Sequence, residues 1–78
     1  MRCIFVQFLC APGRTYEVAD AIYDREVVSE LFSTSGDWDL IAKIYPPEDV
    51  DIGRWLNDTL FSIPGIQRTL TTMTHKAF

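Results

Sequence analysis

The sequence has 78 residues, enough for one small domain, and we expect that domain to span residues 1–78. Its composition, 47% hydrophobic and 13% aromatic, excludes a disordered chain and supplies more apolar surface than one thin core readily hides. The formal net charge of −4, with basic residues scattered singly along the chain, argues against direct binding to nucleic acid, whose phosphates need clustered lysine and arginine.

Both cysteines, Cys3 and Cys10, lie in the first apolar run. On a strand they would be about 23 Å apart and point to opposite faces, which is too far for a disulfide. We therefore expect free thiols and a reducing compartment. The N-terminus lacks a signal-peptide pattern, and no apolar stretch approaches the ~20 residues of a membrane span. These features predict a cytoplasmic protein that has no membrane partner.

The first half of the sequence predicts a strand, a helix and a second strand. Residues 3–10 (CIFVQFLC) are almost all apolar and end at a Pro-Gly pair, which is typical of a buried strand. Thr15 is a suitable N-cap for a helix, because apolar residues then recur with helical spacing. Residues 27–35 (VVSELFSTS) return to strand chemistry and end at the sequence Gly36-Asp37, a strong hairpin signal.

The second half of the sequence repeats this alternation. Residues 38–45 (WDLIAKIY) are the next predicted strand, which Pro46 and Pro47 stop. Asp49 is a candidate N-cap for a second helix, whose apolar residues also follow helical spacing. Residues 66–78 follow a Pro-Gly turn and contain the threonine-rich run TLTTMT, which favours a last strand.

The predicted order β-α-β-β-α-β indicates an α+β fold of the ferredoxin-like kind. With right-handed crossovers, this order gives a four-stranded antiparallel sheet with two helices on one face. Residues 3–10 are apolar on both faces of the sheet, and residues 38–45 are nearly so. Because the helices cover only one face, we expect a second copy of the sheet to cover the other and form a dimeric α/β sandwich or barrel.

Two motifs resemble the effector-binding (RAM) domain of the Lrp/AsnC family of transcriptional regulators. Residues 35–40 (SGDWDL) are similar to the small-Gly-x-aromatic-Asp hairpin of that family, and residues 63–71 (IPGIQRTLT) to its apolar-Pro-Gly-Val-x-x-Thr-x-Thr run. The resemblance extends over nearly the whole chain. It departs from the usual regulator in two ways: the N-terminal DNA-binding domain and linker are not present, which indicates a stand-alone form, and Trp38 stands where Tyr is commoner. A tryptophan there could enlarge or occlude the ligand pocket.

The resemblance also implies partners and a function. It implies homodimers that assemble further, into octamers or similar rings, with amino-acid effectors bound between dimers. The chain would then be an amino-acid-binding and oligomerisation module that acts in transcription regulation without its own DNA-binding domain. Any effect on transcription would require a full-length Lrp/AsnC regulator as a partner.

The candidate ligand-binding residues are Gly36, Asp37, Trp38, Asp39, Thr69 and Thr71. The hairpin could be a plain turn, since glycine supplies a positive φ and aspartate tolerates tight geometry. Exposed turn amides can instead hold a carboxylate while a nearby aspartate holds an ammonium, and these are the two charged groups of a free amino acid. Asp39 is the better ammonium partner because it matches the family's aspartate. The two threonines share one face of the last strand, where they could form a second polar wall or act simply as good strand residues.

We expect no catalytic residue, no metal site and no cofactor. His75 is the only histidine, and the cysteines lack metal-ligand spacing. Two alternatives remain open. The chain could be an oligomerisation partner of a full-length regulator that binds no ligand, or a small dimeric α+β barrel enzyme. The enzyme is disfavoured because the predicted strands carry no histidine or glutamate other than Glu30 and His75.

Overall fold

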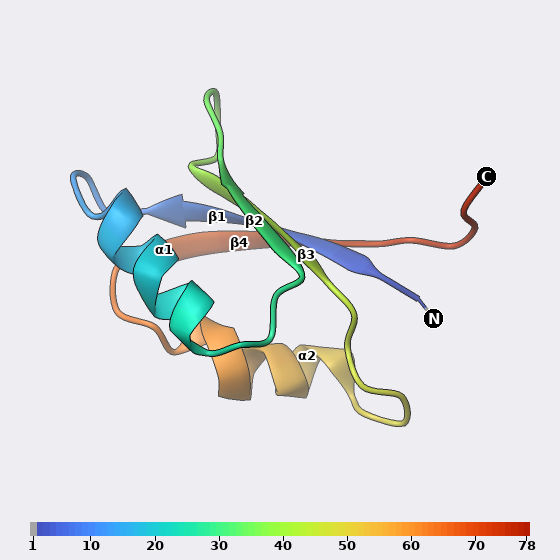
Figure 1. Cartoon of the computed structure of the whole chain (residues 1–78). Coiled ribbons are helices and arrows are strands. Elements are labelled where there is room, and N and C mark those ends of the chain that lie inside the picture. The colour runs from blue at the N-terminus through green and yellow to red at the C-terminus, as the bar shows by residue number, and fades with distance from the viewer. Residues whose placement is uncertain (1) are drawn as a thin grey trace.

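The computed structural model describes residues 2–78, so Met1 of the predicted domain lies outside the described residues. The elements are, in chain order, β1 (Ile4–Cys10), α1 (Thr15–Asp24), β2 (Glu30–Ser33), β3 (Leu40–Ile44), α2 (Ile52–Leu56), the π-helical turn η1 (Asn57–Phe61) and β4 (Ile66–Met73). Figure 1 shows the two helices on the same side of the sheet. The predicted α+β fold of ferredoxin-like type is confirmed.

The sheet is antiparallel throughout and has the strand order β2-β3-β1-β4. β1 is therefore an inner strand between β3 and β4. The predicted strands are longer than the observed ones, most clearly at residues 66–78, of which only Ile66–Met73 is strand. The reason is that Met73 pairs with Ile4, the first residue of β1, so the chain beyond it has no neighbouring strand to bond.

Buried and partly exposed side chains alternate strictly along β1 and β3, and the buried ones form the core. In each strand every second residue is buried, which places one set of side chains under the helices. Residues of both helical segments complete the layer. The buried core consists of Ile4, Val6, Phe8, Cys10, Val18, Ile22, Leu40, Ala42, Ile44, Leu56, Leu60 and Ile63.

The starts of the helices differ from the prediction. α2 is capped by Asp51, whose carboxylate accepts a hydrogen bond from the amide of Arg54 at 3.1 Å, and not by Asp49. Asp49 has a φ of 64°, so it lies in the turn that precedes the helix. Thr15 is the first helical residue of α1 and not its N-cap, a position that Arg14 occupies without a capping side-chain bond.

The second face of the sheet lies opposite the helices, and we call it the open face. Register places Phe5, Gln7 and Leu9 of β1 on it, since these alternate with the buried residues. Their neighbours on the other strands are Phe32, Ile41, Lys43, Arg68 and Leu70. Phe32 and Leu70 are 57% and 45% exposed, so large apolar side chains reach the surface here.

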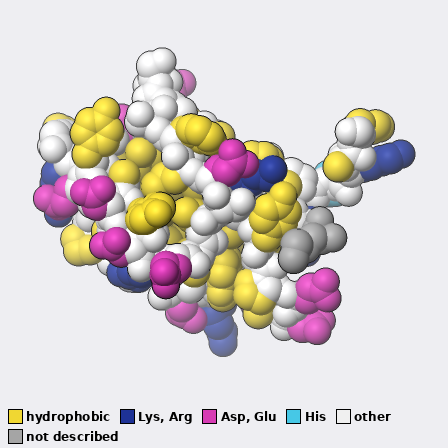
Figure 2. Space-filling model, in the orientation of Figure 1, with side chains coloured by type: hydrophobic (Ala, Val, Ile, Leu, Met, Phe, Trp, Pro, Cys, Tyr) yellow, Lys and Arg dark blue, Asp and Glu magenta, His cyan; other side chains and the backbone are white. Residues whose placement is uncertain are grey.

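Apolar groups also reach the surface elsewhere. Tyr16 and Tyr23 of α1 are more than 70% exposed. Figure 2 shows hydrophobic side chains interspersed with acidic ones over the side of the molecule that it displays. No helix of residues 2–78 is both long enough and apolar enough to cross a membrane.

Candidate functional site

The loop between β2 and β3 contains four of the six predicted ligand-binding residues, and it projects beyond the sheet (Figure 1). Gly36 has a φ of 94°, the left-handed conformation expected at this turn. The loop is closed at its base by a bond from the amide of Thr34 to the carbonyl of Asp39 at 2.9 Å. The hydroxyl of Thr34 also donates to the carbonyl of Trp38 at 2.8 Å. These bonds leave Gly36 and Asp37 exposed at the tip.

Asp39 is joined to the end of β1. Its amide donates to the carbonyl of Phe8 at 2.9 Å, and its carboxylate Oδ2 accepts from the amide of Cys10 at 2.8 Å. This second bond lies where the pairing of β1 with β4 shifts register, between Leu9 and Cys10. The other oxygen, Oδ1, makes no hydrogen bond with any residue that the structure describes. A carboxylate can accept about four hydrogen bonds, so Asp39 retains capacity for a further donor.

The thiol of Cys10 lies beside this carboxylate. Burial raises the pKa of Cys10, the negative charge of Asp39 raises it further, and a hydrogen bond with Thr15 opposes both effects. The thiol is therefore held in its neutral form at physiological pH. This makes Cys10 a packing residue of the core and not a reactive thiolate.

Trp38 contacts a residue that sequence reasoning missed. The guanidinium carbon of Arg68 lies 5.9 Å from the centre of the Trp38 ring, a cation–π contact. Arg68 is on β4 and pairs with Leu9, whereas Trp38 precedes β3, so the contact crosses the end of β1. The only sequence signal for Arg68 was its place inside the motif of residues 63–71, directly before Thr69.

Thr69 and Thr71 lie on the other face of the sheet. Thr69 pairs with Phe8 and Thr71 with Val6, and both of these β1 residues are buried beneath the helices. The two threonines are half-buried on that face. β1 separates them from the β2–β3 loop, and none of the six predicted residues lines the cavities beside Pro47, Phe5, Trp55 and His75. A single chain thus brings Trp38 and Asp39 together with β1 and Arg68, but does not enclose all six positions in one pocket.

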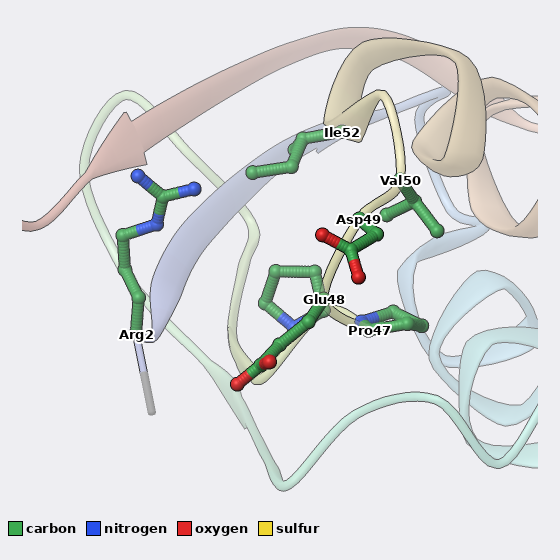
Figure 3. Close-up of a pocket in the computed structure, with 7 residues that line it drawn as sticks. Arg2, Pro47, Glu48, Asp49, Val50 and Ile52 are labelled. Atoms are coloured by element: carbon green, nitrogen blue, oxygen red, sulfur yellow. The ribbon is translucent and has the colours of Figure 1, made fainter.

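A cavity of about 460 Å³ lies where β3 leads into α2. Its lining comes from Arg2, Ile52 and the connecting residues 46–50. Figure 3 shows Arg2 on one side of this hollow, and Glu48 and Asp49 across it. A second cavity of about 220 Å³ lies on the open face, where Lys43 approaches Glu30 at 3.7 Å.

Metal-binding groups do not converge in the part of the chain that the structure describes: no three His, Cys, Asp or Glu side chains could share an ion there. His75 follows β4 and lies in a cavity wall with Arg2 and Cys3. Residues 2–78 of a single chain therefore offer no set of side-chain ligands for a metal ion.

A model of the Lrp/AsnC ligand binding domain matches residues 3–78. The chain belongs to the Lrp/AsnC family. The HTH-type transcriptional regulator FL11 of Pyrococcus abyssi is 32% identical over 75 residues, which are 92% of this chain and 49% of the regulator. FL11 of Pyrococcus horikoshii is 31% identical over the same length. The chain thus spans about half the length of the curated relatives that it matches, and those relatives are transcriptional regulators.

Solved structures support the same family fold. The protein TTHA0845 from Thermus thermophilus has a TM-score of 0.88 at 24% identity, with 100% of this chain and 98% of that chain covered. Protein PHS023 from Pyrococcus horikoshii has a TM-score of 0.84 at 25% identity, with 99% and 93% covered. The Neisseria meningitidis regulator NMB0573, solved as a complex with L-Met, has a TM-score of 0.81 at 18% identity, with 96% and 50% covered.

Proposed function

We propose that this chain is a self-associating module that binds an amino acid and serves Lrp/AsnC-type transcription regulation. The observation that carries the proposal is the state of Asp39. Oδ2 is fixed by the amide of Cys10, and Oδ1 has no partner among the described residues. Because its orientation is already set by the fold, the carboxylate loses little conformational freedom when it accepts an ammonium.

The strength of such a contact is sufficient for a sensor. A charge-assisted hydrogen bond contributes about 1.5–3 kcal/mol, which is roughly 10- to 100-fold in affinity. The exposed backbone amides around Gly36 and Asp37 are additional hydrogen-bond donors on the same loop. The L-Met bound to the Neisseria meningitidis regulator is an amino acid in a protein of this fold, and it supports the choice of ligand class.

The open face supports the part of the proposal that concerns self-association. Phe5, Phe32, Ile41 and Leu70 give the open face an apolar surface opposite the helices. A second copy of the chain would cover this surface with an identical one and form a homodimer. Further assembly of dimers into an octamer or a similar ring would place an effector between dimers, where the β2–β3 loop of one copy could meet residues of another. A full-length Lrp/AsnC regulator could join the same assembly.

The test is a thermal-shift screen of the assembled protein against the twenty amino acids, followed by calorimetric titration. A ligand at about 100 times its dissociation constant should raise the free energy of unfolding by about 2.7 kcal/mol. If none of the twenty binds while the assembly is intact, the sensor proposal is wrong. The alternative is then a module that only oligomerises, and the apolar open face favours it.

A further inference from the structure

Arg68 differs from two other basic residues of the chain, Arg14 and Lys43, because no carboxylate of the described chain pairs with it. Arg14 pairs with Glu17, and Lys43 with Glu30. Arg68 is exposed, has no carboxylate within 4 Å among residues 2–78, and lies over the indole of Trp38 instead. A cation–π contact at this distance leaves the N–H donors of the guanidinium available to a ligand.

The position of this cation relative to Asp39 is the second observation. Arg68 pairs with Leu9, and the carboxylate of Asp39 accepts a hydrogen bond from the amide of Cys10. The two charged residues are therefore neighbours of consecutive residues of β1. Arg68 lies on the β4 side of β1 and Asp39 on the β3 side, since these two strands flank β1. They do not form an ion pair with each other. A cation and an anion therefore lie beside the end of β1, and each retains hydrogen-bonding capacity that the described chain does not use.

A free amino acid has the complementary arrangement, because a carboxylate and an ammonium are attached to one carbon. A guanidinium can bind a carboxylate through two parallel N–H···O bonds, which a lysine ammonium cannot reproduce. We propose that Arg68, which makes the cation–π contact with Trp38, binds the carboxylate of the effector while Oδ1 of Asp39 receives its ammonium. This inference rests on the proposed amino-acid-binding function and names a residue for it that no sequence motif assigned.

The pairing also gives Trp38 a defined role. The guanidinium of Arg68 lies over the indole at 5.9 Å from the ring centre, so the ring serves as a support for the anchor. Trp38 is then a positioning residue. A leucine at this position would leave Arg68 in place but free to change its orientation, and it should weaken binding less than loss of the guanidinium itself.

The experiment compares ligands that differ only at the carboxylate. The probes are the twenty amino acids and, for each one that binds wild type, its methyl ester, titrated against wild type, Arg68→Gln, Arg68→Lys and Trp38→Leu. Wild type should prefer the free acid over the ester by roughly 10- to 100-fold. Arg68→Gln should lose that preference, so that acid and ester bind it about equally, and Arg68→Lys should retain part of it.

The matched control is a second arginine, away from the proposed site. Arg54→Gln removes an exposed arginine of α2 and should leave both affinities unchanged. If wild type binds an amino acid but acid and ester bind alike, or if Arg68→Gln keeps the preference, Arg68 is not the anchor although the module still binds amino acids. If wild type binds none of the twenty, the proposed function and this inference both fail. Circular dichroism and light scattering on each variant verify fold and assembly.

Discussion

Asp39 makes three hydrogen bonds, two to β1 and one to the residue that follows β2, through its own backbone and side chain. Its amide bonds to β1, its carbonyl closes the β2–β3 loop at Thr34, and its carboxylate holds the amide of Cys10. The residue that we propose as the ammonium partner is therefore also part of the fold. A substitution at this position has to be chosen so that the two roles separate.

Asparagine separates them and alanine does not. In Asp39→Asn the amide oxygen can still accept the Cys10 N–H, so the free energy of unfolding should change little, whereas affinity for the effector should fall roughly 10- to 100-fold. In Asp39→Ala the buried Cys10 amide loses its partner, which should lower the free energy of unfolding by about 1–3 kcal/mol in addition. Urea unfolding and calorimetric titration measure the two quantities. Asp37→Ala, at the exposed tip, is the control and should bind normally. Equal affinities of wild type and Asp39→Asn would place the ligand elsewhere.

The thiol of Cys10 predicts a dependence of stability on pH. Burial, and then the charge of Asp39, raise the folded-state pKa of this thiol above its unfolded value of about 8.5. The folded state thus binds the proton more tightly, and this contribution to stability is complete below the unfolded pKa and is lost as pH rises through the folded pKa. Urea unfolding of wild type between pH 7 and 10 should show a steeper loss than Cys10→Ala over the same range. Parallel curves for the two proteins would contradict the assignment.

The sequence located part of the candidate site and missed the rest for a physical reason. Residues 36–39 are contiguous, and their glycine and aspartates mark a turn without knowledge of the fold. The partners of that turn are not local. The amide of Cys10 is 29 positions from Asp39, and Arg68 reaches Trp38 from a different strand. Only the register of the assembled sheet brings these groups together.

At the scale of elements, the start of α2 is a feature that the residue pattern alone does not determine. The apolar spacing after residue 50 predicted a helix, and a helix is present, but Asp49 and Asp51 are equally good cap residues by type. The backbone decides between them: Asp49 is in the left-handed region, whereas Asp51 is extended and places its carboxylate over the amide of Arg54. The helix continues as the π-helical turn η1, which the spacing did not predict.

This assignment of the cap is testable with a matched pair of variants. Asp51→Ala should lower the free energy of unfolding by about 1 kcal/mol, because the first turn of α2 loses a side-chain acceptor. Asp49→Asn should have little effect, since asparagine tolerates the left-handed conformation and Asp49 caps nothing. The measurement is the urea midpoint of each variant at constant m-value. A larger loss in Asp49→Asn than in Asp51→Ala would show that the helix begins before Ile52.

At the scale of the whole molecule, the two faces of the sheet are unequal. One is sealed by α1 and α2, and the other presents aromatic and aliphatic side chains from all four strands. A chain of this size buries only about 60% of the surface of its unfolded form, so the free energy of unfolding of a monomer is small. A second copy on the open face would remove that apolar surface from water and stabilise both copies.

Phe32 tests whether the open face is the contact surface. Phe32 is 57% exposed in the single chain, so Phe32→Lys should not disturb its core but should bring charge into a buried contact. We expect light scattering at micromolar concentration to show a dimer or larger species for wild type and a smaller species for the variant. Tyr23→Lys is the control, because Tyr23 is an equally large, 72% exposed aromatic residue on α1. A monomeric wild type, or an equal effect of both variants, would contradict this contact.

The inner position of β1 has a consequence for the time at which the fold can form. Of the four strands, β1 is synthesised first, yet its two neighbours, β3 and β4, are synthesised much later, and Ile4 pairs with Met73. Loop closure over such separations is slow compared with local helix formation. Until β4 emerges, the apolar strand of residues 4–10 has an unpaired edge and can pair with other nascent chains. We therefore expect the sheet to close only after β4 is synthesised, and its formation to depend on protection of β1 until then.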